Sequence, residues 1–148
     1  LNKIIQDLAR VLDDALCRPH GISLRLNLAD ALPVLPRGCD AIRQILLNLI
    51  RNAAEALGQG GMITVSTQDR INLHGRQYVE MTIADTGPGL PDHLYAKLFQ
   101  PAASTKGDGH AGLGLAIVKN LADELGGQTL CRPNSGGGSI FMVLLPLN

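Results

Sequence analysis

The period of the hydrophobic pattern changes several times along this chain, and this feature most restricts the folds open to it. Apolar residues recur with a helical period over residues 1–17, alternate strictly with polar residues over 22–28, and return to a helical period from about 40 to 57. Pro19 and Gly21 separate the first two segments, as expected where one element ends. The chain therefore combines helices and strands.

The second half of the chain continues the same alternation. Strands are expected at 62–67, 78–84, 128–131 and 139–145, helices at 91–99 and 113–125, and a loop at 100–111. A polar turn at 72–75 joins the first two of these strands, which predicts an antiparallel hairpin. We expect an α+β fold, a two-layer sandwich in which helices cover one face of a mixed, mainly antiparallel sheet. Residues 1–148 are expected to form one domain.

Composition argues against several kinds of partner. Thirteen basic residues balance thirteen acidic ones, so no overall field attracts the chain to nucleic acid or to an anionic membrane. The cysteines at 17, 39 and 131 form no zinc or redox pair, which favours a reducing, cytoplasmic compartment. Apolar runs such as 45–50 are too short to cross a membrane. Because the chain begins with Leu1 rather than methionine, we expect a longer parent protein, and that parent could carry a membrane anchor.

The second helical segment carries a line of polar side chains. At about 100° per residue, Asn48, Asn52 and Glu55 fall within roughly a 60° wedge beside the apolar stripe of the helix. Asparagine is a poor helix former, and amide and carboxylate oxygens are ligands that Mg²⁺ accepts. The three residues are therefore candidates for metal and phosphate contacts. The alternative is that they form the polar margin of an ordinary amphipathic helix.

A first glycine turn follows the strand expected at 78–84. Residues 85–89 read Asp-Thr-Gly-Pro-Gly, which places a carboxylate at the mouth of a tight bend. A buried Asp85 would accept a hydrogen bond from an exocyclic amine of a ligand, and the glycines would let that ligand approach the backbone. Taken alone, such a string is more often an ordinary turn.

A second glycine segment, Gly-Leu-Gly-Leu at 112–115, is expected to open a helix. The unpaired N–H groups and the positive end of the helix dipole would receive phosphate oxygens. The segment does not match the dinucleotide pattern G-x-G-x-x-G, since residue 117 is isoleucine. The string G-x-x-x-x-G-K-[ST] is absent from the chain, which argues against a P-loop nucleotide site.

Together, the order and spacing of these motifs resemble the catalytic, ATP-binding domain of sensor histidine kinases. Residues 48–55 resemble its N box, 85–89 its first glycine box, 99–101 with 104–106 its F box, and 112–115 its second glycine box. The resemblance covers essentially the whole chain. It implies the Bergerat fold, which type II topoisomerases, mismatch-repair ATPases and related chaperones share.

The resemblance also implies ATP and Mg²⁺ as cofactors and suggests a role for each site residue. Asn52 would ligate Mg²⁺, with Asn48 assisting at the metal and the phosphates. Asp85 would bond the adenine amino group, and Ser139 would join it through water. Further contacts are implied for the glycine boxes and the lid: Gly87 and Gly89 at the purine, and Thr105, Lys106, Gly112, Leu113, Gly114 and Leu115 at the phosphates.

Position 48 bears on the reaction. Hydrolytic members of the superfamily carry a water-activating glutamate there, whereas the neutral amide of Asn48 cannot act as a general base. The sequence therefore favours transfer of the γ-phosphate to a protein side chain. Glu55 is a candidate for a substitute base, although we expect it to contact the metal through water instead.

Two of the motifs depart from the family pattern. Ala102 and Ala103 stand where a second phenylalanine of the F box is usual, which predicts a lid that closes less firmly. His110 stands where the first glycine of the second glycine box is expected.

None of the four histidines lies in the phosphoacceptor context H-[ED]-x-x-[NT]-P. The phosphorylated histidine is therefore expected on a dimerisation domain of the same parent protein, with a response regulator downstream. Two alternatives stay open from the sequence. One is a serine protein kinase of the anti-sigma or mitochondrial type, and the other is a degenerate ATP-sensing interaction module.

Overall fold

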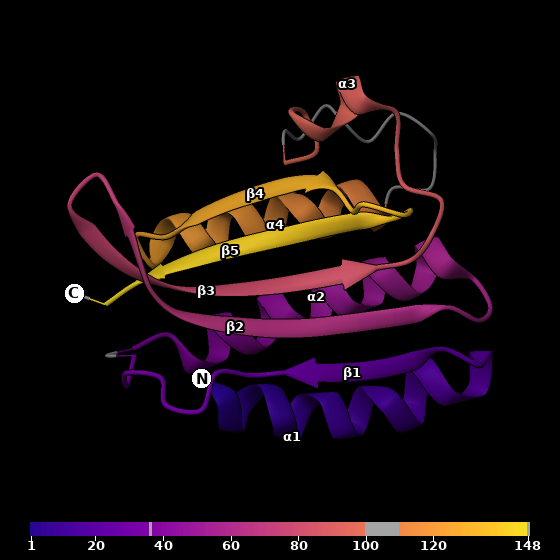
Figure 1. Ribbon diagram of the computed structural model, residues 1–148, viewed down its shortest axis with the longest axis horizontal. Helices are drawn as coiled ribbons and strands as arrows, with labels where there is room; N and C mark the ends of the chain where they lie inside the picture. Colours follow the sequence, from indigo (N-terminus) through magenta and orange to yellow (C-terminus); the bar gives the residue numbers. More distant parts are fainter. Residues whose placement is uncertain (36, 100–109, 148) are drawn as a thin grey trace.

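The strands of this protein form one twisted sheet with helices layered against it (Figure 1). The computed structural model describes residues 1–35, 37–99 and 110–147. Within these residues the helical elements are α1 (Asn2–Leu12), a π-helical turn (Asp13–Cys17), a 3-10 turn (Arg18–His20), α2 (Cys39–Leu57), α3 (Asp92–Tyr95) and α4 (His110–Glu124). The strands are β1 (Ser23–Asn27), β2 (Met62–Leu73), β3 (Arg76–Asp85), β4 (Gln128–Pro133) and β5 (Ser139–Pro146).

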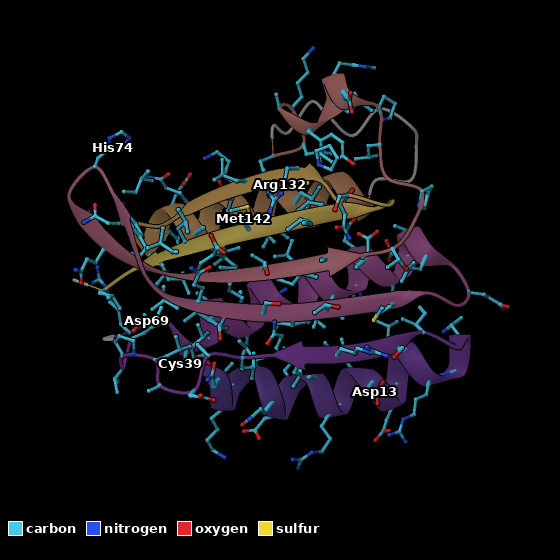
Figure 2. All side chains as sticks on the ribbon, viewed as in Figure 1. Asp13, Cys39, Asp69, His74, Arg132 and Met142 are labelled. Carbon is cyan, nitrogen blue, oxygen red and sulfur yellow. The ribbon has the colours of Figure 1, made fainter. Side chains whose placement is uncertain are left out.

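The order of the strands confirms the predicted mixed, mainly antiparallel sheet. In the described part of the chain the sheet has five strands in the order β1-β2-β3-β5-β4. Only β1 and β2 are parallel, while the other neighbouring strands are antiparallel. Helices α2 and α4 lie against one face, and α1 runs beside β1 (Figure 1). Arg132 and Met142 lie on the other face (Figure 2).

The core lies between the sheet and α2. Because side chains alternate along a strand, Val79, Met81 and Ile83 of β3 all point toward the helices, and the next residue in this series is Asp85. The apolar stripe of α2 meets them with fully or almost fully buried side chains: Ile42, Ile45, Leu46, Leu49, Ile50 and Ala53. The strand that builds the core therefore also carries a carboxylate to its edge.

The boundaries of several elements differ from the sequence-based expectations. The first helix does not continue as an α-helix to residue 17, because residues 13–17 form a π-helical turn. The spacing of five between buried Leu12 and Cys17 is longer than one α-helical turn, and the wider turn keeps both side chains on the buried side. The hairpin is longer than expected, because β2 continues to Leu73 and β3 begins at Arg76. The polar run at 68–70 interrupts the apolar alternation from which the end of β2 was predicted.

Strand β1 differs from the expectation of one buried face. Leu24 is only half-buried and Leu26 is 40% exposed. The reason is that β1 is an edge strand, with a neighbour on one side only. Strict alternation shows which side chains share a face, but it does not show whether another layer covers that face.

The loop expected at 100–111 falls largely on residues 100–109, which lie outside the described residues. No helix in the described part of the chain is both long and apolar enough to cross a membrane.

The position of Leu49 in the core can be tested. Its side chain is fully buried, so Leu49→Ala should lower the free energy of unfolding by about 3 kcal/mol through lost burial and the cavity left behind. Urea unfolding followed by circular dichroism measures this change. The control is Val34→Ala, at a side chain that is 90% exposed, which should change stability by less than about 0.5 kcal/mol. Equal effects of the two variants would contradict this packing.

Candidate functional site

Asp85 is a buried carboxylate at the end of β3. Its side chain is 3% exposed, and its Oδ1 accepts the backbone N–H of Gly87 at 2.9 Å. Burial raises the pKa of Asp85 above the ordinary value of 3.8, while backbone N–H groups of Gly87 and Ser139 lower it in part. No cation in the described part of the chain contributes to this shift.

The raised pKa has a consequence for stability. The neutral form of Asp85 is favoured in the folded state, so the stability that this residue contributes is fully present below pH 3.8 and is lost as the pH rises through the folded pKa. At neutral pH the ionised carboxylate therefore lowers the stability of the free protein. A buried group that costs stability in this way is a candidate for binding a ligand.

The backbone around Asp85 is closely packed at two glycines, both with positive φ. Gly138 has φ of +94°, and a Cβ there would collide with the carbonyl oxygen of Asp85. Gly89 has φ of +70°, and its Cβ would lie 3.1 Å from the carbonyl oxygen of Gly138. The side-chain amide of Asn134 also donates to the carbonyl oxygen of Asp85 at 3.0 Å. The glycine turn after β3 and the turn before β5 thus interlock at Asp85.

Tyr95 of α3 ties the same two turns together. Its hydroxyl accepts the backbone N–H of Leu90 at 3.0 Å and shares a hydrogen bond of 3.0 Å with Oγ of Ser139. Both Tyr95 and Ser139 are buried. Tyr95 and Asn134 are site residues that the sequence did not predict. Their partners lie 44 and 49 residues away in the chain, and no local pattern in the sequence indicates such contacts.

Helix α2, which carries the polar line, ends beside the first glycine turn. Asn48 and Asn52 are half-buried, whereas Glu55 is exposed. The last turn of α2 reaches Gly87, since a Cβ on Gly87 would lie 3.5 Å from the carbonyl oxygen of Ala56. The structure therefore brings the end of α2, Gly87 and Asp85 together, as the combined motifs predict.

Asn48 has an unsatisfied polar atom. Its Oδ1 is 3.4 Å from Nε2 of Gln44, but its Nδ2 is buried and has no hydrogen-bond partner in the described part of the chain. A buried donor without a partner costs about 1–3 kcal/mol, so such atoms are rare in native proteins unless a ligand or water completes them. The unpaired amide is a second indication of a ligand next to α2.

Helix α4 begins earlier than expected. His110, not Gly112, is its first residue, so Gly114 and Leu115 lie beyond its first turn. Their N–H groups belong to the hydrogen-bond ladder of the helix, and the unpaired N–H groups are those of the first turn, which includes Gly112. The side chain of Leu115 is buried in the core with Val118 and Ala122. An anion site at this helix would therefore use its first turn.

The F box is described only in part. Phe99 packs edge-on against Phe141 of β5, with ring centroids 6.1 Å apart. Thr105 and Lys106 lie outside the described residues, as do the two alanines at 102 and 103.

A divalent cation at this site would depend on amide and ligand oxygens. No three histidine, cysteine, aspartate or glutamate side chains gather as a metal site in the described ranges. The polar groups of α2 that face inward are the amides of Asn48 and Asn52. Such a set fits Mg²⁺, which binds proteins through few ligands and completes its shell with water and phosphate oxygens.

Comparison with known proteins gives the following matches. The sequence profile of a family described as histidine kinase-, DNA gyrase B-, and HSP90-like ATPase matches residues 39–148. The sensory histidine kinase/phosphatase NtrB of Salmonella typhimurium is 38% identical over an alignment of 135 residues that covers 87% of this chain and 38% of that protein. The sensor histidine kinase ZraS of Klebsiella oxytoca is 37% identical over 149 residues, covering 100% of this chain and 31% of that protein. The chain thus spans about a third of the length of these curated relatives.

Solved structures have the same fold. The nucleotide-free catalytic domain of histidine kinase ThkA matches with a TM-score of 0.85 and 28% identity, over 99% of this chain and 92% of that domain. Full-length ShkA, solved in complex with AMPPNP, matches with a TM-score of 0.80 and 28% identity, over 97% of this chain and 29% of that protein.

Two glycine variants separate the effect of close packing between Gly138 and Asp85 on stability from the effect of backbone strain. Gly138→Ala adds a methyl group that collides with the carbonyl of Asp85, whereas Gly136→Ala adds one to open space at a similar φ of +88°. Both variants carry the backbone strain of a non-glycine residue at positive φ, but only Gly138→Ala also overpacks the turn. We therefore expect the free energy of unfolding of Gly138→Ala to be lower than that of Gly136→Ala by about 2 kcal/mol or more. Urea unfolding of both proteins measures the difference. Equal losses would contradict the interlocked turns.

Proposed function

Because this chain belongs to the family of histidine kinase-, DNA gyrase B- and HSP90-like ATPases, we propose that it binds Mg-ATP and transfers the γ-phosphate to a histidine on a separate dimerisation domain. The family match confirms the resemblance identified from the four motifs. NtrB and ZraS are sensor histidine kinases, which supports a kinase domain over a gyrase or chaperone domain. The observation that carries the proposal is the buried, uncompensated carboxylate of Asp85.

In this proposal Asp85 recognises adenine. A carboxylate held by two backbone N–H groups still has lone pairs that accept a hydrogen bond from the exocyclic amino group. Guanine presents a carbonyl oxygen at that position, which would leave the buried carboxylate without a donor. Ser139 is buried beside Asp85 and would join this contact through water. Gly87 and Gly89 would let the purine approach the backbone.

The phosphates would lie between α2 and the start of α4. The amide oxygens of Asn52 and Asn48 would hold Mg²⁺, which neutralises phosphate charge when it is bound. The unpaired Nδ2 of Asn48 would donate to a phosphate oxygen, which relieves the cost of its burial. The first turn of α4, with Gly112 and Leu113, would add N–H donors. Lys106 and Thr105 complete the proposed phosphate contacts, and Gly114 and Leu115 extend the helix that supports them.

Transfer to histidine fits the chemistry of these residues better than hydrolysis does. Asn48 cannot remove a proton from water, whereas a neutral imidazole attacks phosphorus without a general base. Catalysis would consist mainly of positioning and charge neutralisation. Glu55 is exposed, and we propose that it contacts the metal only through water. A response regulator would then receive the phosphate from the histidine.

Adenine recognition by Asp85 can be tested by calorimetric titration with ATP in the presence of Mg²⁺. Asp85→Asn presents an amide group to the amino group of adenine, so we expect affinity to fall about 10- to 100-fold. In the wild-type protein, affinity should also fall as the pH drops through the raised pKa of Asp85, because the protonated carboxyl loses acceptor capacity. Asp92→Asn, at an exposed carboxylate, is the control. Unchanged affinity in Asp85→Asn would refute the adenine contact.

Phosphotransfer can be tested with radiolabelled ATP and a panel of histidine-bearing dimerisation helices. We expect acid-labile label on the helices, and a rate at least about 100-fold lower in Asn52→Ala, because the metal contact is lost. Asn27→Ala, at an exposed asparagine of β1, is the control and should retain the wild-type rate. Acid-stable label on serine would favour the serine kinase. ATP binding without transfer to any helix would favour an interaction module.

A further inference from the structure

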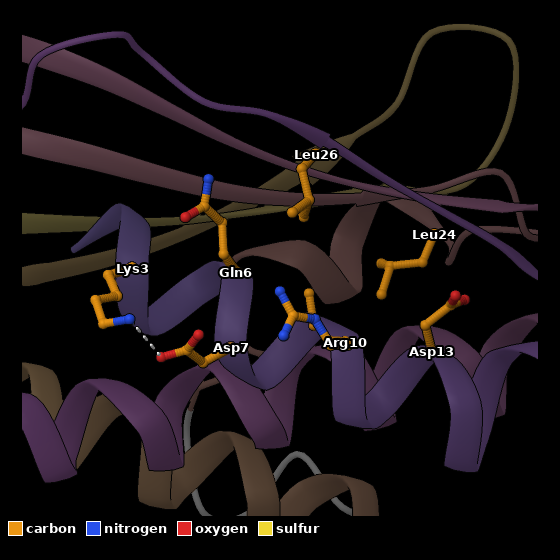
Figure 3. Close-up of a pocket in the computed structure, with 8 residues that line it drawn as sticks. Lys3, Gln6, Asp7, Arg10, Asp13, Leu24 and Leu26 are labelled. Atoms are coloured by element: carbon orange, nitrogen blue, oxygen red, sulfur yellow. Dashed lines mark ion pairs between the residues drawn. The ribbon is translucent and has the colours of Figure 1, made fainter.

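A groove lies between α1 and the edge strand β1, on the side of the sheet that faces the helices. It has a volume of about 520 Å³ and is lined by polar residues of α1 and apolar residues of β1 (Figure 3). Its lining is Lys3, Gln6, Asp7, Ala9, Arg10, Asp13, Leu24 and Leu26. None of these residues belongs to the proposed nucleotide site. We propose that this groove and the free edge of β1 bind an extended, acidic peptide segment of a partner protein.

The backbone of β1 is suited to this because one of its edges is unpaired. The N–H of Ser23 donates to Gly61 O at 2.9 Å, so Ser23, Arg25 and Asn27 direct their backbone groups toward β2. The N–H and C=O groups of Leu24 and Leu26 therefore point away from the sheet. An edge strand with such unpaired groups can bind another extended chain by adding it to the sheet.

The side chains of the same two residues lie in the groove. Leu24 and Leu26 face α1, and Leu26 keeps 40% of its surface exposed (Figure 3). An added strand would place every second side chain on this side, at the spacing that separates the two leucines. One valine-sized side chain between them would cover apolar surface that nothing in the described part of the chain covers.

The charges around the edge favour an acidic partner. In the groove, Lys3 pairs with Asp7 at 3.6 Å, and Asp13 pairs with Arg18 at 3.0 Å. Arg10 lies between these pairs and forms no ion pair with any described residue (Figure 3).

The other side of β1 carries a second unpaired cation. The exposed side chain of Arg25 alternates with the two leucines, so it points to the opposite face, and it has no ion pair among the described residues. A strand at this edge would meet a guanidinium on each of its faces. Acidic side chains on both faces of the peptide complement this arrangement.

The probe for the test is a fluorescein-labelled heptapeptide in which valine and glutamate alternate along each face of the extended chain. We expect saturable binding by fluorescence anisotropy at low salt. Arg10→Glu should weaken binding about tenfold, because it replaces an attraction by a repulsion. Arg132→Glu, on the edge strand at the other end of the sheet, should leave binding unchanged. ATP affinity, measured in parallel, should be the same in both variants.

Two further probes separate strand addition from general attraction. The same peptide with methylated backbone nitrogens keeps its charge but cannot donate to β1, and we expect it to bind at least tenfold more weakly. The lysine version of the peptide should not bind. Equal binding of the methylated peptide, or an unchanged affinity in Arg10→Glu, would overturn the proposal. Binding to anionic phospholipid vesicles but not to the peptide would also overturn it, in favour of a membrane surface.

Discussion

The buried carboxylate of Asp85 is the constraint on which the rest of the site depends. It occupies the core-facing position of β3 that follows Val79, Met81 and Ile83 on the same face of the strand. No cation in the described part of the chain compensates its charge. Two backbone N–H groups hold it, from Gly87 and from Ser139. The donor from Ser139 reaches it because Gly138 lets the turn before β5 approach so closely, whereas Gly87 belongs to the turn that follows Asp85 itself. Core packing and the proposed ligand contact therefore use the same atoms.

Helix α2 combines two roles that impose opposite demands on its residues. One side supplies much of the core, with Leu46, Leu49 and Ile50 fully buried. The adjoining margin carries Asn48, whose buried amide lacks a partner. A leucine there would cost less in the free protein, because a buried donor without a hydrogen bond is unfavourable. Asn48 and Asp85 thus lower the stability of the free protein where the proposed nucleotide contacts lie.

Two places on the sheet, the end of β3 and the edge strand β1, have different proposed functions. At the C-terminal end of β3, the glycine turns and Tyr95 fix the backbone around Asp85 through close contacts and hydrogen bonds. At β1 the packing is incomplete, because this edge strand has only one neighbour and Leu26 stays partly exposed. The first arrangement suits a small ligand of defined shape. The second suits an extended chain that supplies the missing strand.

The sequence by itself determined the type and order of the elements, the polar line on α2, and the motif order that identifies the family. Periodicity and glycine positions report local backbone geometry, and that geometry is what these features depend on. Only the tertiary structure decided that β1 lies at the edge, that α4 begins at His110, and that Tyr95 and Asn134 brace the site. These depend on neighbours across the sheet and on partners more than 40 residues away, about which the local pattern carries no information.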